Sequence, residues 1–225
     1  ARLISLPSAA ATALALVTAL ASLVSPAPAA AAATGFAHAG WTAVLERFVD
    51  DGGLVDYAGL ARDRAGLDRY LAALALASPD SAPQLFPTRD DELAYWLNAY
   101  NALVVAGVLD RGVATPSVWG DGLFGIGFFT VSRGTLGDQR MSLQHLEDEI
   151  VRERYRDPRI HAALNCASVG CPRLPRRAFA GATLAADLDA AMREFVARER
   201  HCRIDAARRT VWLSKIFDWF EDDFV

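Results

Sequence analysis

The sequence has few cysteines, no excess of positive charge and no internal repeat. Its 225 residues carry 23 Lys and Arg against 27 Asp and Glu, which gives a formal net charge of -4 at pH 7. Broad binding to nucleic acid needs many cationic side chains to neutralise phosphates, so we expect no nucleic-acid partner. Low-complexity sequence is also absent after the first 33 residues, and the remaining length fits one domain with a sizeable core.

The first 33 residues form an alanine-rich segment whose only charge is Arg2. An apolar stretch ends near Val24, and two prolines and a run of small residues follow it. This order is typical of a secretory signal peptide, with cleavage expected between Ala30 and Thr34. No cysteine lies at that junction to carry a lipid anchor, so no membrane attachment is expected after cleavage. We therefore expect an exported protein, either periplasmic or secreted.

Hydrophobic periodicity predicts an α+β fold for 34–225: a single compact domain, mostly helical, with two short β-hairpins. Helices are expected near 41–52, 59–76, 90–111, 142–155 and 184–200. Hairpins are expected at 127–142 and at 202–214, the second with its turn at 206–209. The part near 91–110 is apolar almost all round, so we expect it to be the buried central helix.

Two of the three cysteines lie in HAALNCASVGCPRL, residues 161–174. A histidine five residues before Cys166 could act as the base for a thiol nucleophile. In an oxidising compartment, however, Cys166 and Cys171 could form a disulfide, or either could pair with Cys202. His161 and the two thiols also supply three possible zinc ligands, but no fourth ligand is evident and structural zinc sites use tighter pairs. No metal or other cofactor is expected.

Two asparagines of the central helix, Asn98 and Asn101, are three residues apart and therefore share a face. Their amides could hold the backbone of a neighbouring loop, or they could orient a catalytic imidazole or stabilise an oxyanion. Glu147 lies in the helix before the cysteine segment and could orient His161. The alternative for Glu147 is an exposed glutamate paired with an arginine.

Arginine is concentrated around the cysteines, at positions 152, 154, 156, 159, 173, 176 and 177. Most of these side chains are expected to form a solvated face balanced by nearby acidic residues. One or two of them, with Arg159 and Arg173 as the candidates, could bind a carboxylate or phosphate of a substrate. The other histidines, at positions 38, 145 and 201, are expected at the surface or in linkers and receive no role.

Four segments, at 95–105, 141–151, 157–174 and 213–224, resemble in sequence and in order the family called domain of unknown function 547. The resemblance implies a family but no activity, because the family is named for its lack of a known one. Similar proteins often have histidine or asparagine where this chain has Asp148. They also usually continue beyond the last segment, so we expect this chain to lack the family's C-terminal tail. Some relatives carry a glutaredoxin-like domain.

These observations lead to two functional hypotheses. The first is an exported thiol-dependent hydrolase or acyltransferase, of the papain or transglutaminase type, acting on a peptide or small-molecule amide. Cys166 would be the nucleophile, His161 the base and Glu147 the orienting carboxylate, with Asn98 or Asn101 stabilising or orienting. The alternative is a non-catalytic binding module with a structural disulfide and an arginine-rich face for an acidic ligand. The enzyme hypothesis requires these side chains to meet in one pocket.

Overall fold

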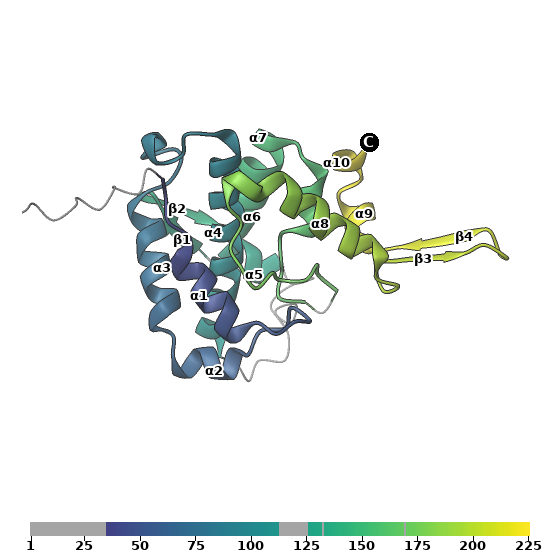
Figure 1. Cartoon of the computed structure of the whole chain (residues 1–225), viewed down its shortest axis with the longest axis horizontal. Helices are drawn as coiled ribbons and strands as arrows, with labels where there is room; N and C mark the ends of the chain where they lie inside the picture. Colours follow the sequence, from purple (N-terminus) through teal and green to yellow (C-terminus); the bar gives the residue numbers. More distant parts are fainter. Residues whose placement is uncertain (1–34, 113–125, 132, 169) are drawn as a thin grey trace, which may run out of the picture. The chain divides into compact units, whose positions relative to one another are not determined.

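One long helix, α4 (Arg89–Arg111), runs through the centre of the computed structural model (Figure 1). The structure describes residues 35–112, 126–131, 133–168 and 170–225, which belong to one compact unit. The expected signal peptide lies outside the described residues. The bounds and the burial of α4 confirm the predicted central helix.

The ends of α4 are set by local sequence. At its start, Thr88 and Asp91 form a capping box: the Thr88 hydroxyl accepts from the Asp91 N–H at 3.1 Å, and the Asp91 carboxylate accepts from the Thr88 N–H at 3.2 Å. This exchange satisfies backbone groups that have no partner within the helix. At the other end Gly112 has φ 90°, a conformation that glycine adopts without steric cost.

Three N-terminal helices precede α4: α1 (Ala39–Phe48), α2 (Tyr57–Arg62) and α3 (Ala65–Leu76). Helix α3 packs against α4, α1 packs on α3, and α2 contacts α1. The single helix expected at 59–76 is therefore wrong, because the chain breaks between α2 and α3. Asp63 leaves the helical conformation there and pairs with Arg47 of α1 at 2.7 Å. The loop expected at 78–87 contains one 3-10 turn, η1 (Pro83–Leu85).

The first hairpin consists of β1 (Arg133–Leu136) and β2 (Gln139–Ser142), paired antiparallel. Its turn residues Gly137 and Asp138 have φ of 54° and 70°, as a two-residue type I′ turn requires. Residues 126–131, expected as part of a strand, instead form the short helix α5 (Ile126–Val131), and this form buries Phe128. The predicted hairpin is thus present but shorter than expected.

A continuous helical segment follows β2, and it is the predicted helix at 142–155. It comprises α6 (Leu143–His145), the π-helical segment η4 (Leu146–Arg152) and α7 (Glu153–Tyr155). Ser142 caps its start as predicted, with its hydroxyl accepting from the His145 N–H at 3.1 Å. The π-helical segment was not foreseen; such segments are rare and occur frequently at functional sites.

The C-terminal third begins with the 3-10 turns η5 (Pro158–Ala162) and η6 (Gly181–Thr183) and the helix α8 (Leu184–Ala197). The second predicted hairpin follows as β3 (Cys202–Asp205) and β4 (Thr210–Leu213), and it extends away from the helices (Figure 1). Two short helices, α9 (Lys215–Trp219) and α10 (Glu221–Phe224), come last.

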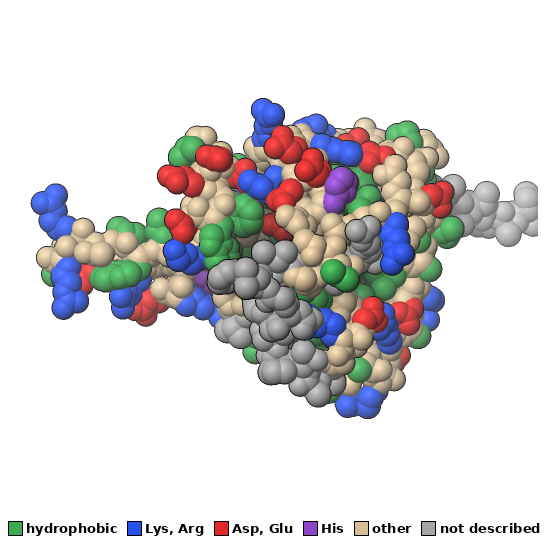
Figure 2. Space-filling model, turned by 180° about the vertical axis from the view of Figure 1, so that it is seen from behind, with side chains coloured by type: hydrophobic (Ala, Val, Ile, Leu, Met, Phe, Trp, Pro, Cys, Tyr) green, Lys and Arg blue, Asp and Glu red, His purple; other side chains and the backbone are tan. Residues whose placement is uncertain are grey.

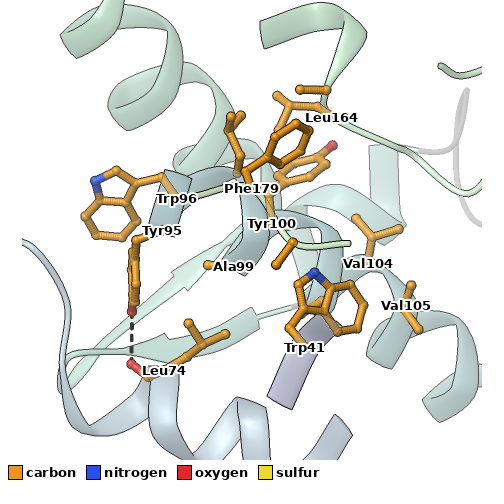
Figure 3. Packing of buried hydrophobic residues seen from close by; sticks show 14 of the residues in the cluster. Trp41, Leu74, Tyr95, Trp96, Ala99, Tyr100, Val104, Val105, Leu164 and Phe179 are labelled. Atoms are coloured by element: carbon orange, nitrogen blue, oxygen red, sulfur yellow. Dashed lines mark hydrogen bonds between the residues drawn. The ribbon is translucent and has the colours of Figure 1, made fainter. Parts of the chain in front are cut away.

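Large aromatic side chains fill the core around α4 (Figure 3). Tyr95 and Trp96 pack edge to face with ring centroids 4.9 Å apart, and Trp41 stacks on Tyr70. The buried Tyr95 hydroxyl donates to the Leu74 carbonyl at 3.0 Å, so its polar atom is satisfied. The architecture confirms a mostly helical α+β fold with two separate two-stranded sheets. No helix of the described residues has the length and apolar character to cross a bilayer.

Candidate functional site

The two asparagines of α4 each hold the backbone of a distant loop. The Asn98 amide donates to the Phe179 carbonyl at 2.8 Å and accepts from the Phe179 N–H at 3.0 Å. The Asn101 amide donates to the Ala163 carbonyl at 3.0 Å and accepts from the Asn165 N–H at 2.9 Å. Both side chains are buried, and their donors and acceptors are engaged by these bonds. Of the two roles considered for them, this geometry matches loop anchoring.

Glu147, in the π-helical segment, is held by a tyrosine of the central helix. The Tyr100 hydroxyl donates to Glu147 Oε2 at 2.8 Å. Burial raises the pKa of Glu147 to about 7, although the Tyr100 hydrogen bond opposes the shift. Burial also raises the pKa of Tyr100, and the neighbouring Glu147 adds to that shift. Near neutral pH, therefore, the protonated and ionised forms of the Glu147 carboxyl are both populated.

His161 is bound by Asp223 of α10. Its Nε2 lies 2.7 Å from Asp223 Oδ2, and its ring stacks on Phe220 with centroids 4.2 Å apart. The expectation that Glu147 orients this histidine is thus corrected, because the carboxylate at the ring is Asp223. Burial lowers the pKa of His161, while Asp223 raises it by less, so the ring is neutral near pH 7. The sequence carried no signal for this contact, which depends on α10 packing against η5.

Arg152 connects the two carboxyl groups on either side of it. Its guanidinium lies 2.6 Å from Asp223 and 2.8 Å from Asp148. Burial alone would raise the pKa of Asp223, but the hydrogen bonds of Arg152 and His161 outweigh it and hold this pKa below its usual value. The charges of Arg152, Asp148 and Asp223 also act on Glu147. The sequence-predicted Glu147 and His161 therefore belong to one polar neighbourhood without contacting each other directly.

Cys166 and Cys171 are joined by a disulfide, and Cys202 is not in one. The Cys166 N–H donates to Cys171 Sγ at 3.2 Å. A bonded sulfur cannot act as a nucleophilic thiolate, so a thiol mechanism at Cys166 would require reduction of this bond first. The imidazole of His161 is engaged by Asp223, and the described residues contain no cluster of three or more His, Cys, Asp or Glu side chains that could hold a metal ion.

The arginines around the cysteine segment do not form one free basic face. Each of the seven takes part in an ion pair, and the acidic partners are spread over the sequence. The pairs are Arg152 with Asp148 and Asp223, Arg154 with Asp80, Arg156 with Glu153, Arg159 with Asp157 and Asp189, Arg173 with Glu194, Arg176 with Asp51, and Arg177 with Asp187. The positive charges are therefore largely balanced and point in several directions.

Two of these arginines meet at a cavity of about 150 Å³ between α8 and the segment before it. Arg173 and Arg177 line it together with Arg198, which follows α8. Glu194 lies between two of them, 2.9 Å from Arg173 and 2.5 Å from Arg198. Arg159, the other predicted binding residue, pairs with Asp157 and Asp189 and is not among the described residues that line the cavity.

His201, expected at the surface or in a linker, lies in the linker between α8 and β3, but it is buried at the same cavity. Its ring stacks on Phe195 with centroids 4.2 Å apart, and Nε2 accepts from Arg200 Nε at 3.1 Å. Burial, aided by Arg200 and Arg198, lowers the pKa of His201 to about 4. Its polar flanking sequence, RERHCR, gave no sign of this burial.

A family model described as "Protein of unknown function, DUF547" matches residues 85–196. This range contains α4 with both anchoring asparagines, the Glu147 segment and the cysteine segment, whereas Asp223 and the second hairpin lie beyond it. No curated protein and no solved structure is significantly similar to the chain. The match confirms the resemblance for three of the four segments found in the sequence, and residues 85–196 belong to the DUF547 family.

Proposed function

We propose that this domain binds a small anionic group, a carboxylate or a phosphate, in the cavity beside α8. The observation that carries the proposal is the convergence of Arg173, Arg177 and Arg198 on one small cavity. Asp187 and Glu194 are the acidic residues among those lining it, so three positive charges less two negative charges leave one positive charge. The planar guanidinium group binds carboxylate and phosphate oxygens through paired hydrogen bonds.

The surroundings favour a preformed site. Glu194 bonds both Arg173 and Arg198, and this holds the two guanidinium groups before a ligand arrives. His201 is neutral near pH 7, so it adds no positive charge that would repel the neighbouring arginines in the empty site. Fixed donors reduce the entropy lost on binding. This arrangement corresponds to the binding-module hypothesis, with the ligand site confined to one cavity rather than spread over an arginine-rich face.

The test is an NMR titration of the protein with inorganic phosphate and, separately, with succinate. Arg198→Gln and Arg177→Gln should each weaken binding by about tenfold or more, since a charge-assisted hydrogen bond is lost. Arg193→Gln is the matched control, because Arg193 is exposed on the same helix and does not line the cavity. Shifts away from the cavity, or equal loss in the control, would show that the site is elsewhere.

A thiol-dependent hydrolase or acyltransferase acting on amides is the second candidate. Two observations favour it: Cys166 is partly exposed, and His161, five residues before it, is bonded to a carboxylate as a catalytic imidazole often is. Protein treated with reductant should then hydrolyse an activated ester or a peptide anilide, and Cys166→Ser should abolish the reaction. Cys202→Ser is the control. Equal rates for reduced protein and Cys166→Ser would remove this candidate.

Export remains part of the proposal and rests on the order of residues in 1–33. N-terminal sequencing of the protein recovered from its native host should give a mature chain that begins between Ala30 and Gly35. Recovery in the cytoplasm with the segment intact would contradict export.

A further inference from the structure

A second cleft, of about 330 Å³, has the disulfide in its wall. Both Cys166 and Cys171 line it, and the facing wall comes from the base of the second hairpin and from α9. Leu213, Lys215 and Trp219 belong to that facing wall. The disulfide is therefore placed at a surface where another molecule can reach it, unlike a bond enclosed in a core.

The two sulfurs differ in access and in hydrogen bonding. Cys166 is partly exposed, whereas Cys171 is only 4% exposed. The buried sulfur accepts the Cys166 N–H at 3.2 Å, a contact that would stabilise negative charge on Cys171. A thiolate arriving from the cleft therefore meets Cys166 first, and Cys171 is the better leaving group.

The charges of the cleft also suit a thiolate. Arg200 and Lys215 line it, and no acidic side chain is among its described lining residues. Lys215 pairs with Asp218 at 2.8 Å, so this neighbour offsets its charge, and Arg200 supplies most of the remaining positive charge. The lining of the cleft is therefore net positive and favours the anionic form of an incoming thiol.

An apolar strip leads to the cleft along one face of the second hairpin. The register pairs Cys202 with Leu213 and Ile204 with Val211, and side-chain alternation puts these four on one face. Ile204, Val211 and Leu213 are 71%, 55% and 57% exposed. Leu213 also lines the cleft, so strip and cleft are continuous. Hydrophobic side chains are visible along the projecting hairpin in Figure 2, beside arginines.

We propose that the Cys166–Cys171 disulfide exchanges with the thiol of an extended, apolar, cysteine-containing peptide segment that lies along this hairpin. A two-stranded sheet has open edges that can pair with an extended chain, and the strip offers contacts for its apolar side chains. The positive cleft complements the thiolate of that segment. His201 lines both this cleft and the anion cavity, but exchange depends on the two sulfurs and anion binding on the three arginines, so separate measurements test the two proposals.

The exchange balances without another reagent. The peptide thiolate attacks Cys166 Sγ, a new S–S bond forms between peptide and Cys166, and the Cys166–Cys171 bond breaks. Its electron pair goes to Cys171 Sγ, which becomes a thiolate and takes a proton from solvent. The product is a mixed disulfide at Cys166 with one free thiol at Cys171.

The experiment uses the full chain purified without reductant and two synthetic peptides, each with one cysteine. One peptide surrounds the cysteine with valine and isoleucine, and the other with serine and threonine. Mass spectrometry should show the protein plus one whole peptide, and digestion should place the adduct on Cys166. The apolar peptide should react about tenfold faster or more, because its side chains bury apolar surface on the hairpin.

Variants then separate docking from simple access to the disulfide. Ile204→Ser with Val211→Ser should remove the preference for the apolar peptide while the polar peptide reacts as before. Arg203→Gln, on the opposite face of the same strand, is the matched control and should keep the preference. A Cys202→Ser background excludes exchange through the third thiol. Equal rates for the two peptides, an adduct only at Cys171, or unbonded sulfurs in the starting protein would each overturn the proposal.

Discussion

The two hairpins have strands of the same length, paired antiparallel, but opposite surroundings. In β1–β2, Leu136 and Met141 are buried, and the turn N–H groups of Gly137 and Asp138 donate to the end of α3 at 2.9 and 3.1 Å. In β3–β4 the apolar residues stay exposed, and the hairpin joins the fold at its base through the buried His201. A two-stranded hairpin alone is marginally stable in water. The first hairpin is therefore stabilised by the core, whereas the second presents its surface.

Removing an apolar side chain from each hairpin should give the largest difference. Leu136→Ala is expected to lower the free energy of unfolding by about 3 kcal/mol, because it opens a cavity in a fully buried site. Val211→Ala should change it by less than about 0.5 kcal/mol, because Val211 is exposed. Urea unfolding followed by circular dichroism measures both. A large loss in Val211→Ala would mean that the second hairpin is covered in solution.

The inner region should also depend on its anchoring amides. Asn101→Ala leaves the Ala163 carbonyl and the Asn165 N–H without this partner, and should cost about 2 to 3 kcal/mol of unfolding free energy. Gln139→Ala, an exposed position of β2, is the control and should be neutral. Thermal and urea unfolding would test the pair. A neutral Asn101→Ala would show that the loop needs no anchor from α4.

The buried carboxyl of Glu147 should give the inner region a pH dependence. Its folded pKa of about 7 exceeds its unfolded value of 4.5, so the folded state retains the proton longer. This group costs no stability below about pH 4.5, lowers stability as the pH rises to about 7, and has a constant effect above that. Glu147→Gln should therefore be more stable than the parent by about 3 kcal/mol at pH 8 and equal to it near pH 4. A gain independent of pH would contradict this assignment.

The two turns should differ in their tolerance of substitution. Gly137 has φ 54°, and a Cβ there would clash with the buried Ser78, so Gly137→Ala should cost about 2 kcal/mol or more. Arg209, in the second turn, has φ 49° although it is not glycine. Arg209→Gly should relieve this strain and raise the unfolding free energy by up to about 0.5 kcal/mol, or leave it unchanged. Melting temperatures of the two variants would compare the turns directly.

Much of the fold could be predicted from local sequence. The acidic first turn and Gly112 marked α4, Ser142 marked the start of the next helix, and the short strands around 206–209 marked the second hairpin. Predictions failed where local propensity was weak: residues 126–131 became helical because Phe128 packs inside, and 59–76 split where Asp63 meets Arg47. In the first case the burial of an aromatic side chain outweighed the local pattern, whereas the exposed Arg47–Asp63 pair only accompanies the break in the second.

The candidate site was harder to predict. Asn98, Asn101, Glu147 and His161 were identified by residue type and spacing, but their partners could not be. Tyr100, Phe179 and Asp223 are brought to them by packing. Most of the clustered arginines were expected to be balanced by nearby acidic residues, and the ion pairs with Asp148, Glu153 and Asp157 confirm this. The sequence could not show the distant partners Asp80, Asp189 and Asp223.

The sequence by itself determined the central helix, the two hairpins and the residues able to do chemistry, because composition and periodicity act over a few neighbouring residues. The family followed from the resemblance of whole segments and not from these local patterns. Only the tertiary structure decided that the asparagines hold loops and that His161 faces Asp223. It likewise decided that one cavity collects three arginines and that one hairpin leaves its apolar face in solvent. These outcomes depend on which elements pack together, and packing is set by the burial of the whole core rather than by any single segment.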